Sequence, residues 1–435
     1  MDFTRIMTIE KFQRHRACGD LSALSLVQSG LERIHSMDGE HGAWVHIADP
    51  ASLLQLAAAS DARWKSGASL SPLDGLPFSV KDSQHVAGMP TTFGSLAADP
   101  VIPAQSSPIV ERLQKAGAIA LGKTSLPEFS WKATTESPRS GITRNPRYPQ
   151  YSPGGSSGGA AVSIAQGACF LATGTDAAGS VRIPAAFTGT VGFKPSDSIA
   201  LSTGAVEGFK RIGHWGLHTR TAADLNMVWS ALYESAGAPN QLRWACIDPS
   251  TRMGRRAKLF YDARVARMVE LFGPPTAVFR PDWLSAGQAI YSLYLRGCSE
   301  TVARINMSGL QQVDLGLADF ANRGAFVSAQ QLAQAIDIQD RLRSMLDQMF
   351  ESVDILVMPT VAFDPPLIGK ESPEEAGVKD WLDWAHCTYL TNLTGHPSLS
   401  LPGELEGVPF GMQVIGQKGR DAELLAACVK IERLM

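Results

Sequence analysis

A segment rich in glycine and serine, residues 152–159, most constrains how this chain of 435 residues folds. Its sequence is Ser-Pro-Gly-Gly-Ser-Ser-Gly-Gly, and a related segment, residues 174–182, has the sequence Gly-Thr-Asp-Ala-Ala-Gly-Ser-Val-Arg. Segments of this composition are usually flexible linkers. Here apolar runs lie between and after them, at 160–165, 168–172 and 183–187, so both segments must belong to packed structure. Glycine in packed sequence indicates tight turns or backbone that approaches a ligand, and serine adds hydroxyl groups. The two segments therefore predict an active site.

Composition limits the classes of protein to which the chain can belong. Hydrophobic residues make up 44% and charged residues 19%, which is enough to build a large core. A formal net charge of -3 argues against a nucleic-acid surface held by electrostatics. The six cysteines are scattered without a Cys-x-x-Cys pair, which favours reduced thiols over disulfides or a zinc site. Residues 1–5 begin no signal peptide, and no apolar run is long enough to span a membrane, so we expect a cytoplasmic protein.

Helical and strand patterns alternate along the chain, which predicts an α/β fold. Apolar spacing and capping residues predict helices over residues 21–34, 50–65, 108–117, 158–166, 221–235, 332–349 and 421–434. Short apolar or alternating runs predict strands over residues 76–81, 118–121, 170–173, 353–358, 398–401 and 410–415. The pattern is weak between Arg243 and Asn322, where we expect helices with connecting loops. No linker or internal repeat divides the chain.

Residues 117–124, Gly-Ala-Ile-Ala-Leu-Gly-Lys-Thr, match the phosphate-binding P-loop pattern. In a P-loop the four variable residues form a loop after a strand, and a helix follows. Here those residues are apolar and resemble the strand itself, and Pro127 follows too closely for a regular helix. We therefore interpret Lys123 as the end of a buried strand and keep nucleotide binding only as a distant alternative.

Residues 155–159, Gly-Ser-Ser-Gly-Gly, match the nucleophile-elbow pattern of Ser-His-Asp hydrolases. That motif requires a strand directly before it, whereas the residues before this one are typical of a loop. A triad would draw its base from the downstream histidines, and this alternative stays open. The candidates are His214, His218, His386 and His396.

A third arrangement joins Lys81, Ser156 and Ser180. A serine nucleophile needs a base and a site for an oxyanion. Ser180 closes a turn of small residues after a predicted buried strand, where successive amides can converge on one point. Lys81 ends a mostly apolar strand, and burial there would leave it neutral enough to act as a base. The alternative is that Lys81 is a surface lysine and the glycines serve only turns.

Ordered motifs along nearly the whole chain resemble the amidase signature family. The spacing of Lys81, Ser156 and Ser180 matches that family as well. The weakly matched part is the middle, from about Arg243 to Phe326. The motifs occupy residues 75–82, 88–92, 122–124, 127–129, 153–159, 174–182, 192–195, 353–360 and 392–397.

The resemblance implies a single compact α/β domain over residues 1–435, with a twisted mixed sheet covered by helices. Within it we expect four parts along the chain. They are N-terminal helices at 1–70, the signature core at 71–240, a variable substrate-side region at 241–330 and the C-terminal part of the core at 331–435.

The resemblance also implies a Ser-cisSer-Lys triad. Ser180 would be the acyl-forming nucleophile, Ser156 would follow a cis peptide bond and bridge it to the base, and Lys81 would be the base. The backbone amides of the preceding turn would form the oxyanion hole, and the residues implied are Ala177, Ala178, Gly179 and Ser180. Asp176 and Arg182 match motif positions that we interpret as structural supports of this loop. The main departure from the family is Ala178, which stands where glycine is usual.

The implied reaction is hydrolysis of a small-molecule carboxamide, or a related amide or ureide, with no metal and no organic cofactor. Met89 and Trp131 lie in loops beside the motifs and are candidates for an acyl pocket, although ordinary packing explains them as well. We expect no nucleic-acid or membrane partner, and a homodimer is the working hypothesis for the assembly. Two alternatives stay open: a glutaminase-type component of an amidotransferase complex, and a degenerate family member with a binding role.

Overall fold

The structure, a computed structural model, describes residues 7–196, 209–233, 235–239, 241–249 and 252–434. Residues 1–5, on which the signal-peptide argument rests, lie outside the described residues. Within these described ranges, no helix has the length and apolar character needed to cross a membrane. All six cysteines are free thiols, and only Cys18 is exposed.

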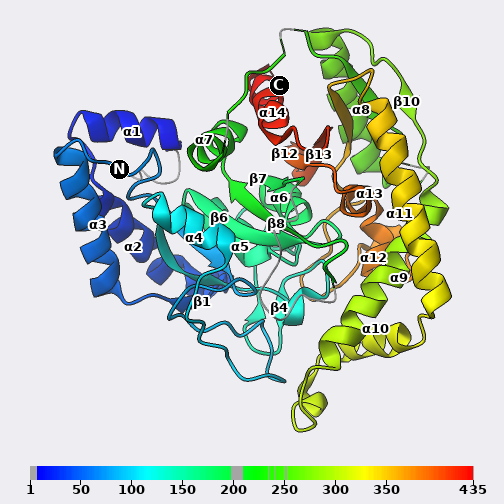
Figure 1. The fold of residues 1–435 in the computed structure, drawn as a ribbon, viewed down its shortest axis with the longest axis horizontal. Coiled ribbons are helices and arrows are strands. Elements are labelled where there is room, and N and C mark those ends of the chain that lie inside the picture. The colour runs from blue at the N-terminus through cyan, green and yellow to red at the C-terminus, as the bar shows by residue number, and fades with distance from the viewer. Residues whose placement is uncertain (1–6, 197–208, 234, 240, 250–251, 435) are drawn as a thin grey trace.

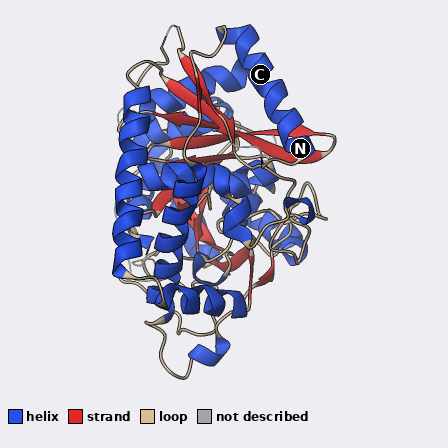
Figure 2. Ribbon diagram, turned by 90° about the vertical axis from the view of Figure 1, so that its right-hand side faces the viewer, coloured by secondary structure: helices blue, strands red, loops and turns tan. Residues whose placement is uncertain are grey.

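A mixed sheet of eleven strands, in the order β1-β3-β2-β6-β8-β7-β12-β13-β11-β9-β10, forms the centre of the molecule. Figure 2 shows helices on both sides of these strands. A separate small hairpin pairs β4 (Glu136–Ser137) with β5 (Gly141–Ile142). The strands of the large sheet are β1 (Trp44–Ile47), β2 (Pro77–Lys81), β3 (Ile119–Thr124), β6 (Leu171–Asp176), β7 (Val191–Lys194), β8 (His214–Thr219), β9 (Trp244–Ile247), β10 (Val278–Phe279), β11 (Ile355–Pro359), β12 (Ser398–Leu405) and β13 (Val408–Gly416).

The N-terminal helices and the helices around α9 to α11 lie at opposite ends of the molecule (Figure 1). The α-helices are α1 (Ile9–Ala17), α2 (Ala23–His41), α3 (Pro50–Lys65), α4 (Pro108–Lys115), α5 (Gly158–Ala165), α6 (Arg182–Thr188), α7 (Ala222–Leu232), α8 (Arg255–Phe272), α9 (Trp283–Val302), α10 (Leu315–Ala325), α11 (Ala329–Met349), α12 (Trp381–Trp384), α13 (His386–Thr394) and α14 (Asp421–Leu434). Short 3-10 helices are η2 (Glu128–Ser130), η4 (Leu310–Gln312) and η5 (Glu374–Ala376).

Helices and strands with a strong local pattern lie where the sequence predicts them. Asp49 caps α3 through the Ser52 amide and Pro50 opens the helix, as expected. The expectation of helices and loops alone after Arg243 is wrong, because β9 and β10 lie in that region and pair in parallel. These strands have four and two residues, too few to show a periodic pattern.

Strand β8 was also missed, for a different reason. Its sequence, His-Trp-Gly-Leu-His-Thr, is buried at every position between β6 and β7. A strand covered on both faces shows no alternation of polar and apolar residues, so period-two analysis does not detect it.

The order and direction of β2 and β6 create the site. These neighbouring strands are parallel, with Val80 paired to Thr173, so their carboxyl ends meet at the same edge of the sheet. Lys81 ends β2 and Asp176 ends β6. Crevices at the carboxyl ends of such strands are the usual ligand sites of open α/β sheets. The chain is therefore one α/β domain with its candidate site at this edge.

Candidate active site

Lys81 projects from the end of β2 into a fully enclosed position. Its Nζ donates to Ser156 Oγ at 2.6 Å and to Thr175 Oγ1 at 2.9 Å. Burial lowers the pKa of this amine well below its ordinary value of 10.5, and the negative charge of Asp176 offsets only part of that effect. The interpretation of Lys81 as a surface lysine is therefore wrong.

Ser156 lies directly before α5, whose N-terminal cap is Ser157. The Gly155–Ser156 peptide bond is cis, as the family resemblance implies. A β-carbon at Gly155 would lie 2.6 Å from the carbonyl oxygen of Thr134, so this backbone approach requires glycine. The Ser157 amide donates to the carbonyl oxygen of Ser180 at 3.0 Å. That bond holds the Ser180 backbone beside the glycine-serine segment.

Ser180 lies in the turn between β6 and α6 and is 5% exposed. Its hydroxyl makes no hydrogen bond with any of the residues described. The structure therefore joins Lys81 to Ser156 by a hydrogen bond and places Ser180 next to them, with its hydroxyl uncommitted.

The turn before Ser180 holds the four backbone amides expected to bind an oxyanion. The Gly179 amide donates to Asp176 Oδ1 at 2.7 Å, so it is already engaged in this structure. The amides of Ala177, Ala178 and Ser180 have no acceptor within the described part of the chain. Ala178 does not adopt a left-handed conformation, so its β-carbon causes no backbone strain.

Gly179 is the position in this turn that requires glycine. Its φ is +116°, and a β-carbon there would lie 2.2 Å from Thr388 Oγ1. Thr388, on α13, donates through that oxygen to the carbonyl of Ala178 at 2.6 Å. Helix α13 therefore sets the shape of the turn.

A buried ion pair between Asp176 and Arg182 fixes both ends of the turn. Burial alone would raise the pKa of Asp176, but the charge and hydrogen bonds of Arg182, with a hydrogen bond from Asn392, hold it below its usual range. Arg182 also donates to Thr391 Oγ1 at 2.6 Å and to Asn392 Oδ1 at 2.7 Å, both on α13. Asp176 and Arg182 thus support the loop, as the sequence predicts.

Replacing Arg182 with methionine is expected to destabilise the protein by about 3–5 kcal/mol, because Asp176 would keep a buried charge without its partner. Urea unfolding followed by circular dichroism measures this loss. The matched control is Arg243→Met, which removes a pair with Asp354 that is open to water, with 53% and 24% of the two side chains exposed. The control should lose far less stability, and equal losses would contradict the assigned role of Arg182.

The structure supports neither of the two competing interpretations, the P-loop and the Ser-His-Asp triad. Lys123 lies within β3 and forms a buried ion pair with Asp82 at 3.0 Å, so residues 117–124 form no phosphate loop. Within the described residues, none of the four candidate histidines forms a hydrogen bond with Ser156 or Ser180. The polar side-chain contacts of these histidines are with the Ile212 carbonyl for His214, the Pro249 carbonyl for His386 and Asp347 for His396, and the ring nitrogens of His218 have no hydrogen-bond partner among the described residues.

The two candidate substrate residues lie in different parts of the core. Trp131 belongs to the apolar cluster that also contains Ala178, and it contacts Phe320 with ring centroids 5.3 Å apart. Met89 packs instead against the cluster that contains Phe78. The structure therefore brings Trp131, and not Met89, into the cluster beside the turn.

The sequence analysis assigned no role to several residues that shape the site. Thr175 accepts from Lys81, and Thr388, Thr391 and Asn392 hold the turn from α13. The last three recur at helical spacing on one face, which is a signal that sequence analysis can use. Across the described ranges, no group of three or more histidine, cysteine, aspartate or glutamate side chains is arranged to hold a metal ion.

Comparison with known proteins decides the family. The family model described as Amidase matches residues 25–277 and 308–425. The chain belongs to the amidase family. It is accordingly an amide-hydrolysing enzyme. The two matched segments leave out residues 278–307, which lie inside the middle region that the sequence motifs matched poorly.

Individual relatives cover nearly the whole length of the amidase chain. It is 30% identical to 2-amino-5-chloromuconic acid deaminase of Comamonas testosteroni, over 96% of this chain and 93% of that protein. It is 28% identical to a glutamyl-tRNA(Gln) amidotransferase subunit of Symbiobacterium thermophilum, over 97% and 95%. The crystal structure of an amidase superposes with a TM-score of 0.89 at 28% identity, covering 98% of this chain and 99% of the other.

Proposed function

We propose that this amidase hydrolyses a small-molecule carboxamide, or a related amide or ureide, through an acyl-enzyme on Ser180. The observation that carries the proposal is the 2.6 Å contact between Lys81 Nζ and Ser156 Oγ at a fully buried position. A buried lysine of lowered pKa is able to accept a proton at neutral pH, which a surface lysine is not.

The proposed reaction proceeds as a proton relay. Neutral Lys81 takes the proton of Ser156 as Ser156 takes that of Ser180, and Ser180 Oγ attacks the amide carbonyl. The oxyanion rests on the amides of Ala177, Ala178 and Ser180, which have no other acceptor among the described residues. Ser156 then returns a proton to the leaving ammonia or amine, and water cleaves the ester by the same relay. The chain's own residues carry every step, without a metal or an organic cofactor.

The substrate is the open part of the proposal. Screening aliphatic, aryl and ureido amides for ammonia release identifies the class, and trapping the acyl group with hydroxylamine tests the intermediate. An active enzyme should partition between the acid and the hydroxamate, because an ester on Ser180 reacts with either nucleophile. Turnover of an amide without any hydroxamate would argue against the acyl-enzyme.

A second function is favoured by the similarity to glutamyl-tRNA(Gln) amidotransferase subunits. In that role the site would hydrolyse glutamine and supply ammonia to partner subunits. Ammonia release from glutamine that rises when partner subunits co-purify would support it. Hydrolysis of simple amides by the isolated chain, with glutamine inert, would support the first function. A third alternative, a binding protein without catalysis, requires that no acylating probe reacts.

We also propose that residues 1–435 act as one amidase unit with the four parts expected from the sequence, as a cytoplasmic homodimer. Part 241–330 would then carry the substrate-side variation. Light scattering coupled to size-exclusion chromatography measures the mass of the protein in solution. A mass equal to that of one chain would contradict the proposed homodimer.

A further inference from the structure

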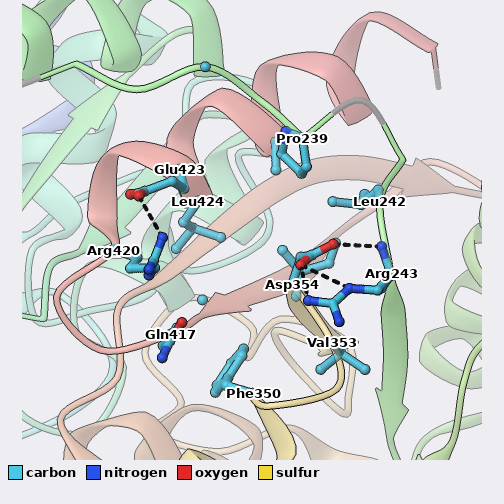
Figure 3. Close-up of a pocket in the computed structure, with 14 residues that line it drawn as sticks. Pro239, Leu242, Arg243, Phe350, Val353, Asp354, Gln417, Arg420, Glu423 and Leu424 are labelled. Atoms are coloured by element: carbon cyan, nitrogen blue, oxygen red, sulfur yellow. Dashed lines mark hydrogen bonds and ion pairs between the residues drawn. The ribbon is translucent and has the colours of Figure 1, made fainter.

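Three cavities have no wall residue among Lys81, Ser156 and Ser180. One, of about 310 Å³, is lined by charged side chains that already pair with each other (Figure 3). Arg243 donates to Asp354 at 2.7 Å, and Arg420 lies 3.2 Å from Glu423. Because these charged groups already have partners, they offer a ligand few free hydrogen-bonding or charged groups. A second, of about 260 Å³, lies beside Leu293 and Leu332.

The third and largest, of about 570 Å³, has the size of a small-molecule site. It lies between the loop after β2 and the segment after α9, and its wall includes Phe93, Ala98, Val101, Phe129 and Ile305. Val101 is 46% exposed, so a ligand can reach the cavity from solvent. The wall is mostly apolar, which favours a ligand that buries apolar surface.

Two phenylalanines of this wall have an unusual backbone. Phe93 has a φ of 55° and Phe129 a φ of 48°, both in the left-handed region that bulky residues rarely adopt. Their rings stack with centroids 5.9 Å apart, and the Phe129 amide donates to the Phe93 carbonyl at 2.8 Å. Backbone held in such regions is concentrated at ligand clamps and active sites. The fold thus holds these two phenylalanines in an energetically unfavourable backbone conformation.

His85 supplies a polar group to the same wall and is only 8% exposed. Its Nδ1 lies 3.1 Å from Thr91 Oγ1, which accepts a hydrogen bond from Lys123 at 2.9 Å. The hydrogen of the threonine hydroxyl has no other acceptor among the described residues, so we assign it to Nδ1 and the proton of the neutral ring to Nε2. Burial and the charge of Lys123 lower the pKa of His85, which keeps the ring neutral at pH 7. Nε2 is thus a donor without an acceptor among the described residues.

We propose that this cavity is a second binding site, separate from the triad, for a neutral aromatic or branched alkyl molecule with one hydrogen-bond acceptor. The stacked phenylalanines contact the apolar part, and His85 Nε2 donates to the acceptor. The charged residues of the wall, Asp99 and Arg304, have opposite signs, so the wall carries no net formal charge that would favour a charged ligand over a neutral one. The site needs no amide bond in its ligand, so the proposal does not depend on the reaction at Ser180.

The test uses 4-fluoroacetophenone, which has one acceptor, and 1-ethyl-4-fluorobenzene, which has none, with binding followed by fluorine NMR. The full chain should bind the ketone about threefold to tenfold more tightly than the hydrocarbon, the worth of one hydrogen bond to a buried donor. His85→Phe should make the two affinities equal. Ala98→Trp fills the cavity and should weaken both at least about tenfold.

The control Leu332→Trp fills the cavity beside Leu293 and should leave both affinities unchanged. Circular dichroism confirms that each variant is folded. Unchanged binding in Ala98→Trp overturns the proposal, and so does a ketone preference that persists in His85→Phe. Displacement of the ketone by amide substrates in proportion to their KM would place it at the triad and also overturn the second site.

Discussion

Ser180→Ala is expected to lower kcat/KM for amide hydrolysis by about 10⁴- to 10⁶-fold, since a catalytic serine and its base act as a unit. The Ser180 hydroxyl makes no hydrogen bond among the described residues, so its loss leaves no buried partner unsatisfied. The variant should therefore fold like the wild type while losing both turnover and labelling by a fluorophosphonate probe. Steady-state kinetics on the amide found by screening, with mass spectrometry of the labelled protein, measures both effects.

The matched control is Ser163→Ala in α5. Ser163 is also a buried serine, but its Oγ bonds to the Ala160 carbonyl at 2.7 Å and to Ser79 at 2.8 Å, and not to Lys81. Its loss should cost stability of about 1–2 kcal/mol and leave the rate per folded molecule near that of the wild type. If Ser180→Ala still hydrolyses amides or still reacts with the probe, Ser180 is not the nucleophile.

Local patterns predicted the elements that carry the site, and they did so for physical reasons. Strand β2 alternates apolar residues with Pro77, Ser79 and Lys81, and α3 has a complete capping signal in Asp49 and Pro50. Strand β8 was missed, because a strand buried on both faces has no polar face to mark its period.

The site itself was predicted through the family resemblance and not through periodicity. Lys81 and Ser156 are 75 residues apart, and no local pattern specifies a contact over that separation. The engagement of the Gly179 amide depends on where the Asp176 side chain points, which the order of residues does not specify. The support from α13 also depends on tertiary structure, since Thr388 lies 210 residues from Ala178.

Lys81→Met is the second variant for which we expect a loss of about 10⁴-fold or more in kcat/KM, because the relay then has no base. In the wild type only the neutral amine is active, so kcat/KM should fall as the pH drops below the pKa of Lys81. That pKa lies well below 10.5, which places the acid limb at lower pH than an ordinary lysine would give. A pH–rate profile measures this limb. If kcat/KM already falls as the pH drops below about 10.5, the pKa of an ordinary lysine, Lys81 is not a base that is neutral at pH 7.

Lys81→Met should lower activity, but it should also remove a loss of stability that the wild type suffers as the pH falls. The unfolded chain protonates Lys81 below pH 10.5, whereas burial keeps the folded amine neutral to lower pH, so the lysine makes the wild type less stable as pH falls through that interval. Methionine removes this pH-dependent penalty, although Ser156 and Thr175 lose a donor. The free energy of unfolding should therefore depend less on pH in the variant than in the wild type.

Lys123→Met separates this behaviour from a general effect of removing a buried lysine. Lys123 is equally enclosed, but it forms an ion pair with Asp82 at 3.0 Å, so its loss leaves a buried carboxylate without its cationic partner. That variant should lose about 3–5 kcal/mol of stability, whereas Lys81 has no carboxylate within bonding distance among the described residues and its replacement leaves no such charge. Urea unfolding and kcat/KM measured on both variants give two opposite patterns: a folded but inactive protein for Lys81→Met, and a destabilised one for Lys123→Met. Equal losses of stability in the two variants would make Lys81 a structural residue and remove it from the relay.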